Sequence, residues 1–172
     1  IIQEYVGTPE SEYTVGVLHD ADGKYLNAIA VKKNILSGLS NRLKIENTTG
    51  NPKFGKTLAL SNGVSQGEIG RFPEVREPCK EIAQRLGSAC SINLQCRVQD
   101  GRVYLFEINP RISGTSSLRA MVGYNEPDLL VRRHVLGETI QPDFPYQSGY
   151  IARGLDERFI SAEAMNNIEV MG

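Results

Sequence analysis

Four polar residues within one stretch of the sequence have the types and spacing of a magnesium site next to a phosphate. They are Gln95, Glu107, Asn109 and Arg111. A carboxylate with carboxamide oxygens suits Mg²⁺, which binds through one or two carboxylates and completes its shell with water and substrate phosphates. An arginine beside them can bind phosphate oxygens through two parallel hydrogen bonds. The alternative is an ordinary solvated face of an antiparallel sheet, and composition alone does not decide between the two.

A β-hairpin is needed to bring these residues together, and the sequence predicts one around an Asp-Gly pair. Its apolar residues reach one core only in certain registers, because side chains alternate strictly along a strand. They are Ile92, Leu94, Cys96 and Val98 before the turn and Tyr104, Phe106 and Ile108 after it. A three-residue loop at 99–101 satisfies this condition by pairing Val98 with Arg102. That register gathers the polar residues on the opposite face, with Gln95 diagonal to Glu107.

A short run of small and hydroxyl-bearing residues follows the hairpin. It comprises Ser113, Gly114, Thr115 and Ser116 and leads into a predicted helix. Such residues commonly cap a helix, and their backbone N–H groups also suit an anion. Capping explains each residue taken singly, whereas the nearness of Glu107 favours an anion.

The remaining elements indicate an α+β domain, mainly antiparallel sheet flanked by short helices. Strands are predicted over 1–6, 12–18, 25–31, 56–61 and 149–152, and helices over 78–87, 117–122 and 126–136. In the first of these helices Pro78 suits the first turn and Gly87 the end. The polar stretch 32–56 lacks a sustained period and is predicted to be a long mobile connection. The glycines at 63, 67 and 70 are interpreted as turns.

Composition limits the classes of partner. The chain has 172 residues, 19 basic and 20 acidic, with a formal net charge of −1. Length predicts one domain, residues 1–172, and the near balance of charge argues against nucleic acid and anionic membranes. No apolar run approaches the roughly 18 residues of a membrane span, and no signal peptide is evident, so a cytoplasmic protein is expected. Ile1 lies within an apolar run, which suggests that the chain continues upstream.

The cysteines and histidines carry little sign of chemistry. Cys79, Cys90 and Cys96 form no C-x-x-C pair and are odd in number, so we predict core thiols rather than a zinc site or a disulfide framework. His134 falls in the last turn of a predicted helix, where a cation suits the helix dipole. His19 lies beside a turn and is given no role.

One motif match is misleading. Residues 50–57 fit the phosphate-loop pattern G-x-x-x-x-G-K-[ST], with Lys56 as its lysine. The chemistry of that loop needs a buried strand before it and a helix after it. The upstream stretch is polar, and a Ser-Asn-Gly turn follows within a few residues, so the sequence argues against a phosphate loop.

The chain resembles the C-terminal lobe of the ATP-grasp superfamily, and most of all carbamoyl phosphate synthase large chains and related carboxylate-amine ligases. The resemblance is carried by Asn93, Leu94 and Gln95, the run 106–114, the Gly-Tyr-Asn at 123–125, the Leu-Gly at 136–137, and the segments 2–6 and 12–15. It extends over residues 1 to about 154. It implies an enzyme that uses ATP and Mg²⁺, with Mn²⁺ as a substitute, to phosphorylate a small-molecule carboxylate. An amine, ammonia or another nucleophile would then attack the acylphosphate.

Residue by residue, the resemblance assigns roles to positions of this sequence. Glu107 would bridge two magnesium ions, with Gln95 and Asn109 as further ligands, and Arg111 would face the phosphates. The backbone of Glu4, Tyr5 and Val6 would meet the adenine edge, and Glu12 the ribose hydroxyls. Ser113, Gly114, Thr115 and Ser116 would border the acceptor carboxylate. A basic residue of the family corresponds to Lys32 or Lys56, and neither match is clean.

The resemblance also sets an expectation about activity. The other lobe of the family, with its glycine-rich flap, has no counterpart in this sequence, so weak nucleotide binding and little turnover by this chain alone are expected. A noncatalytic ATP-grasp-like binding or dimerising module is the alternative, and a homo-oligomer is compatible with either. The intact set of Gln95, Glu107 and Asn109 argues for the enzyme.

Overall fold

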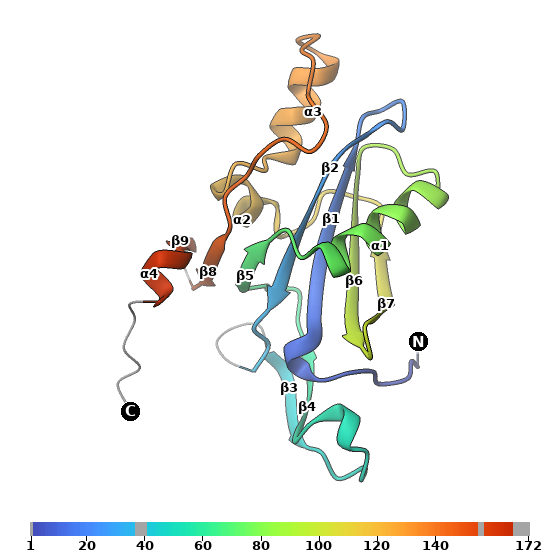
Figure 1. The fold of residues 1–172 in the computed structure, drawn as a ribbon, viewed down its shortest axis with the longest axis vertical. Coiled ribbons are helices and arrows are strands. Elements are labelled where there is room, and N and C mark those ends of the chain that lie inside the picture. Colours follow the sequence, from blue (N-terminus) through green and yellow to red (C-terminus); the bar gives the residue numbers. More distant parts are fainter. Residues whose placement is uncertain (1, 37–40, 155–156, 167–172) are drawn as a thin grey trace.

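The computed structural model describes residues 2–36, 41–154 and 157–166. Within them, a seven-stranded antiparallel sheet has the order β7-β6-β1-β2-β5-β8-β9, and β3 and β4 form a separate two-stranded ribbon (Figure 1). The predicted α+β class with mainly antiparallel pairing is therefore confirmed. Among the described helices, none is both long and apolar enough to span a membrane. The strands are β1 (Glu12–His19), β2 (Tyr25–Lys33), β3 (Asn41–Glu46), β4 (Thr57–Ser61), β5 (Gly67–Gly70), β6 (Ser91–Gln99), β7 (Arg102–Asn109), β8 (Gly149–Arg153) and β9 (Glu157–Ser161), and the α-helices are α1 (Pro73–Arg85), α2 (Ser116–Met121), α3 (Glu126–His134) and α4 (Ala162–Asn166).

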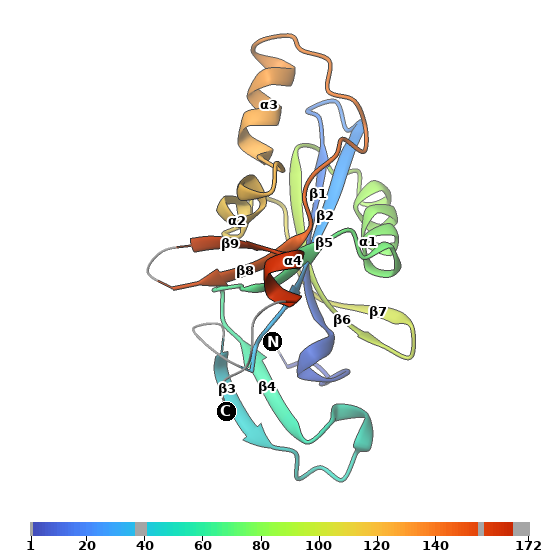
Figure 2. The same ribbon diagram turned by 60° about the vertical axis from the view of Figure 1, so that its left-hand side comes forward.

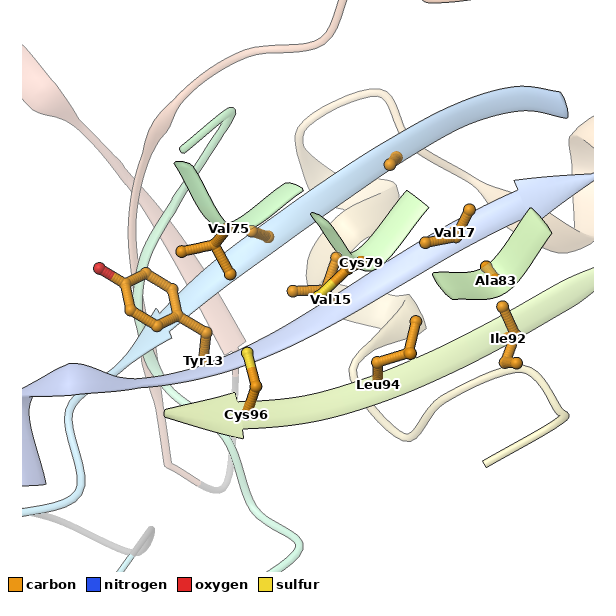
Figure 3. Packing of buried hydrophobic residues seen from close by; sticks show 11 residues of the cluster. Tyr13, Val15, Val17, Val75, Cys79, Ala83, Ile92, Leu94 and Cys96 are labelled. Carbon is orange, nitrogen blue, oxygen red and sulfur yellow. The ribbon is translucent and has the colours of Figure 1, made fainter. Parts of the chain in front are cut away.

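The sheet separates two hydrophobic cores, because side chains alternate between its faces. Helix α1 covers one face, and α2 and α3 lie on the other (Figure 2). On the α1 face, Val15 and Leu94 of the sheet are fully buried with Cys79 of the helix (Figure 3). On the opposite face, Leu118 of α2 packs in one cluster with Ile69 of β5. The candidate site residues share this second face.

Helix α1 begins at Pro73, five residues before the predicted start. Proline suits the first helical position because the first N–H groups of a helix have no partner within it. Pro78, predicted in the first turn, therefore lies inside the helix. The end is as predicted, since Gly87 follows the helix with a left-handed φ of 64°.

The stretch 32–56 is not a structureless connection, and that prediction is wrong for its described part. Strand β3 pairs with β4, and Asn47 organises the loop between them by donating from Nδ2 to the carbonyls of Asn51 at 3.0 Å and Gly55 at 2.7 Å. The prediction failed because a solvated ribbon is held by backbone hydrogen bonds and needs no apolar period. Residues 37–40 lie outside the described residues.

Some other local expectations also need correction. Residues 2–6 form no strand. Gly67 belongs to β5 rather than to a turn, and a Cβ there would lie 2.1 Å from the carbonyl oxygen of Lys32. Cys79 and Cys96 are buried as predicted, but Cys90 is exposed, because it occupies a left-handed position before β6.

Each histidine ends an element, His19 of β1 and His134 of α3. The Nε2 of His134 accepts a hydrogen bond from the backbone N–H of Ala21 at 2.9 Å. His19 is buried, and burial lowers its pKa despite the nearby Asp20.

Candidate functional site

The β6–β7 hairpin has a different register from the predicted one. Gln99 pairs with Arg102 across a two-residue turn at 100–101, whose φ angles of 52° and 72° are left-handed. Such a turn matches the natural twist of a hairpin, which explains why it forms in place of the longer loop. The pairing then shifts between Gln95 and Cys96, where β7 contains one extra residue. This β-bulge restores the alternation that the sequence analysis sought from a three-residue loop.

Beyond the bulge, the predicted metal ligands come together. Gln95 lies directly opposite Glu107, not diagonal to it, and Asn93 lies opposite Asn109. The Nε2 of Gln95 donates to Oε2 of Glu107, and the Nδ2 of Asn109 donates to Oε1 at 2.9 Å. In the described part of the chain, no three His, Cys, Asp or Glu side chains gather as a metal site. The cluster therefore offers one exposed carboxylate with two amides at its sides.

The two-residue turn and the bulge together leave two aromatic residues outside the core in which they were predicted. Val103 and Leu105 pack on the α1 core, so Tyr104 between them faces the opposite side of the sheet. Phe106 is the extra residue of the bulge, and neither it nor Tyr104 belongs to the buried core. Both line a pocket instead.

This pocket has a volume of about 420 Å³, within the range of small-molecule sites. Its other walls are residues 3–6, Leu60 and Ser61 of the ribbon, and the polar side chains of Glu12 and Arg97. Gln3 fixes the segment 3–6 by donating from Nε2 to the carbonyl of Phe106 at 3.0 Å. Three predicted nucleotide-binding residues, Glu4, Tyr5 and Val6, thus share one pocket with a fourth, Glu12.

The carboxylate of Glu12 is buried and fully engaged. Its Oε1 accepts hydrogen bonds from Nζ of Lys33 at 2.8 Å and from Oγ of Ser61 at 2.5 Å. Its Oε2 accepts two from Arg97, at 3.0 Å from Nε and 2.9 Å from Nη2. Burial raises the pKa of Glu12, but Lys33, Ser61 and Arg97 outweigh burial and hold this pKa below its ordinary value. Glu12 is therefore ionised at neutral pH.

Lys33 was missed by the sequence analysis, although it is the lysine of this site. Its ammonium is buried and donates to Glu12, to Oγ of Ser61 at 2.8 Å, and to Oε1 of Gln95 at 3.3 Å. Because Gln95 also contacts Glu107, Lys33 links the pocket to the predicted metal ligands.

Neither lysine suggested by the sequence lies in this cluster. Lys32 pairs with Tyr13 in the β1–β2 register, and its side chain therefore points to the other face of the sheet from Lys33. Lys56 is exposed just before β4. Lys33 lies two residues beyond the predicted strand 25–31, and β2 extends as far as this lysine. The rejection of the phosphate loop was correct, because its lysine is followed by a strand and not by a helix.

Arg97 was also missed, and it joins three parts of the pocket. Its side chain is buried, with Nη1 donating to the carbonyl of Val6 at 3.3 Å and Nη2 to that of Ala59 at 2.7 Å. Its guanidinium carbon lies 4.4 Å from the centre of the Tyr5 ring, a cation–π contact. Arg97 thus holds Glu12, the segment 3–6 and strand β4 in fixed relation.

The predicted acceptor residues lie in the loop between β7 and α2. Arg111 is exposed and donates to the carbonyl of Ile112 at 3.1 Å. Ser113 accepts hydrogen bonds from the backbone and hydroxyl of Thr115, at 3.2 and 2.9 Å. Ser116 donates to Glu126 at 2.6 Å. Thr115 and Ser116 therefore have local structural partners.

The carbonyl of Gly114, in the same loop, has a partner from another strand. Arg153 of β8 donates from Nη2 to this carbonyl at 3.2 Å and to Oγ of Ser117 at 3.1 Å. In this loop Gly114 is exposed and contacts Arg153, whereas Ser113 is half-buried.

A second buried cluster lies under α2 and α3. Glu126 accepts hydrogen bonds from Nη1 of Arg119 at 3.1 and 3.3 Å and from Ser91 at 2.8 Å, in addition to Ser116. Arg119 donates from Nη2 to Asn93 at 2.7 Å. Asn93, which shares the face of Gln95, is therefore committed to holding the helices on the sheet.

Comparisons with known proteins bear on this geometry. A family model described as "ATP-grasp in the biosynthetic pathway with Ter operon" matches residues 1–155. A stretch of 68 residues is 37% identical to the carbamoyl phosphate synthase large chain of Gemmatimonas aurantiaca and covers 39% of this chain and 6% of that protein. A crystal structure of D-alanine–D-alanine ligase from Bacillus anthracis complexed with ATP is similar at 16% identity and a TM-score of 0.35, over 78% of this chain and 41% of that one. The matched stretches span less than half of either protein.

Proposed function

This chain belongs to the ATP-grasp family whose model matches it, as the sequence resemblance predicted. On that premise we propose that it is part of an ATP- and Mg²⁺-dependent carboxylate ligase. In the proposed reaction, a carboxylate oxygen of a small-molecule acid attacks the γ-phosphorus of ATP, and ADP leaves. A nucleophile such as an amine then attacks the carbonyl carbon of the acylphosphate, and phosphate leaves.

The observation that carries this proposal is the order of chemical groups along β6 and β7. The pocket comes first, with Tyr104, Arg97 and Glu12 in its walls, and Gln95 with Glu107 follows. Arg111 and the loop 113–116 follow the end of β7. Successive same-face residues on a strand are roughly 6.6 Å apart. This order is the one that a base with its ribose, then a metal-bound phosphate chain, and then an acceptor would need.

At the nucleotide end, the proposal assigns the adenine to the pocket and its edge to the backbone of Glu4, Tyr5 and Val6. This assignment is supported by the apolar walls and by the backbone amides of Glu4 and Tyr5, which form no hydrogen bond with the described part of the chain. Glu12 is assigned to the ribose hydroxyls and Lys33 to the phosphates.

At the metal end, Glu107, Gln95 and Asn109 would hold Mg²⁺, with Mn²⁺ as a substitute. The donor set fits, because turning the Asn109 amide would present its oxygen beside the Glu107 carboxylate, and Gln95 could add a third oxygen once Lys33 no longer donates to it. A bound cation would neutralise charge on the phosphate oxygens during transfer. The residues of this chain would align the two reactants, with Arg111 opposite the transferring phosphoryl group.

At the acceptor end, Arg111, Ser113 and Gly114 are assigned to the carboxylate substrate, with Thr115 and Ser116 supporting their loop. We further propose slow turnover by this 172-residue chain alone, because the resemblance assigns it to one of the two lobes of the family. Binding is therefore a better first test than turnover.

The replacement Glu107→Gln tests the metal end, because it removes the charge and keeps the shape. We expect Mg²⁺-dependent ATP binding to weaken about tenfold or more, measured by NMR titration of the labelled protein with and without Mg²⁺. The exposed position predicts a free energy of unfolding within about 0.5 kcal/mol of wild type. Glu81→Gln, on the exposed surface of α1, is the matched control and should bind as wild type does. Equal Mg²⁺-ATP affinity in Glu107→Gln and wild type would overturn the assignment.

A further inference from the structure

The bonding of Glu12 conflicts with a simple role in ribose binding. Its two oxygens accept four hydrogen bonds, from Lys33, Ser61 and twice from Arg97. A carboxylate offers about four lone-pair positions. A ribose hydroxyl can therefore donate to Glu12 only after one of these donors has left.

Arg97 and Ser61 are poor candidates for leaving. Arg97 also donates to the carbonyls of Val6 and Ala59, so its movement would leave buried acceptors without a donor. Ser61 donates to Glu12 while it accepts from Lys33, so turning its hydroxyl away would break two hydrogen bonds of the cluster.

Lys33 is the donor most easily withdrawn. Its ammonium is carried on a flexible four-carbon chain, and its other partners are the neutral groups of Ser61 and Gln95. Withdrawal would leave Glu12 paired with Arg97, one negative charge with one positive charge. The buried carboxylate would still be compensated.

The charge of the cluster gives Lys33 a direction in which to move. Lys33 and Arg97 supply two positive charges around the single negative charge of Glu12, and all three side chains are buried. An excess buried charge is unfavourable until an anion approaches it. Lys33 already contacts Gln95, which adjoins Glu107 at the end proposed for the phosphates.

We propose that Lys33 couples the recognition of phosphate to that of ribose. A bound triphosphate draws the ammonium away from Glu12, and the vacated Oε1 position then accepts a ribose hydroxyl. This inference rests on the proposed nucleotide site. Its consequence is that the ribose hydroxyls contribute to affinity only when the ligand also carries phosphates.

Four ligands test the coupling on the unmodified chain, with NMR titration in the presence of Mg²⁺. ATP should bind about tenfold or more tightly than 2′,3′-dideoxy-ATP, as expected for a hydrogen bond to a charged acceptor. Adenosine and 2′,3′-dideoxyadenosine should bind within about twofold of each other, because Lys33 remains on Glu12. An equal hydroxyl preference in both pairs would overturn the coupling.

The replacement Lys33→Met tests the lysine itself, because it keeps a long unbranched side chain without the charge. It should weaken ATP binding and create a preference of about tenfold for adenosine over 2′,3′-dideoxyadenosine. Lys32→Met, one residue away and on the other face of β2, should behave as wild type. A Lys33→Met variant with the wild-type pattern would contradict the proposal.

The outcomes separate this inference from the proposed function. If the chain fails to bind Mg²⁺-ATP at millimolar concentrations, the proposed function itself is wrong. If ATP binds but the two hydroxyl preferences are equal, the nucleotide site stands and the coupling through Lys33 is wrong. If Lys33→Met fails to fold, the four-ligand comparison on the wild-type chain decides alone.

Discussion

Two buried carboxylates on the same face of the sheet, Glu12 and Glu126, have nearly the same partners and different consequences. Each accepts hydrogen bonds from an arginine and from serine hydroxyls. Glu126 and Arg119 are both 0% exposed and their charges balance. Glu12 lies beside a pocket and faces two cations. The two clusters thus differ in charge balance and in the neighbouring pocket, and these features, more than residue type, separate a structural ion pair from the proposed nucleotide site.

A glycine in β1 makes room for the Glu126 cluster. A Cβ at Gly16 of β1 would lie 2.3 Å from Nη1 of Arg119 and 3.1 Å from Oε1 of Glu126. Glycine at this position therefore lets the ion pair approach the sheet directly. The pocket beside Glu12, in contrast, leaves its cluster open to a ligand on one side.

The largest effect is expected from breaking the closed pair. Glu126→Leu should lower the free energy of unfolding by about 3–5 kcal/mol, because it leaves the Arg119 charge buried without a partner. Urea denaturation followed by circular dichroism measures this change. The double variant Arg119→Met/Glu126→Leu should lose much less than the sum of the two single changes. A loss below about 1 kcal/mol in the single variant would show that the cluster is not structural.

A smaller and pH-dependent effect is expected from Glu12→Gln. At pH 7 it should lower the free energy of unfolding by about 2–3 kcal/mol, through weaker bonds to Lys33 and Arg97. The pKa of Glu12 is lowered in the folded state from its ordinary 4.5, so its contribution is complete above that pH and is lost as the pH falls further. The difference between wild type and variant should therefore shrink between pH 5 and pH 3.

The quantity to follow with pH is the difference in free energy of unfolding between wild type and Glu12→Gln. The pKa of Asp20 is also lowered, through hydrogen bonds that outweigh its burial, and this group contributes equally to both curves. A difference that stays constant from pH 7 to pH 3 would contradict the assigned ionisation of Glu12.

The smallest effect is expected at the junction of the two clusters. Thr14 lies between Glu12 and Gly16 on β1, and its hydroxyl donates to Oδ1 of Asn93 at 2.9 Å. Thr14→Val should cost about 1 kcal/mol of unfolding free energy, since Asn93 keeps its bond from Arg119. Combined with Glu12→Gln, its effect should add within about 0.5 kcal/mol if the clusters are independent. A larger departure from additivity would show that the two regions are one network.

Local features of the fold were predictable, because they depend on residues close in sequence. Alternating side chains and an Asp-Gly pair predicted the β6–β7 hairpin, and α3 begins at Glu126, as predicted. The register was not predictable, because the same letters allow a three-residue loop or a two-residue turn followed by a bulge. The second satisfies the twist of the hairpin and also packs Val103 and Leu105 against α1, a contact that the letters of the hairpin do not contain.

The candidate site also has a part that was predictable from neighbouring residues and a part that was not. Glu107, Asn109 and Arg111 follow one another in the chain, and their pattern was sufficient to propose a cation site. The cluster around Glu12 draws Lys33 from β2, Ser61 from β4 and Arg97 from β6. These contacts depend on how strands far apart in sequence meet, and no local pattern encodes them.

The pocket lies between two bodies whose backbones are hydrogen-bonded separately, the main sheet and the β3–β4 ribbon. Two side-chain contacts connect the ribbon to the sheet. Arg97 of β6 donates to the carbonyl of Ala59 in β4, and the exposed Lys53 pairs with Asp100 of the β6–β7 turn at 2.7 Å. A molecule bound in the pocket would contact both bodies and so connect them further. Its affinity would then depend on how rigidly the ribbon is held as well as on the groups that the molecule contacts.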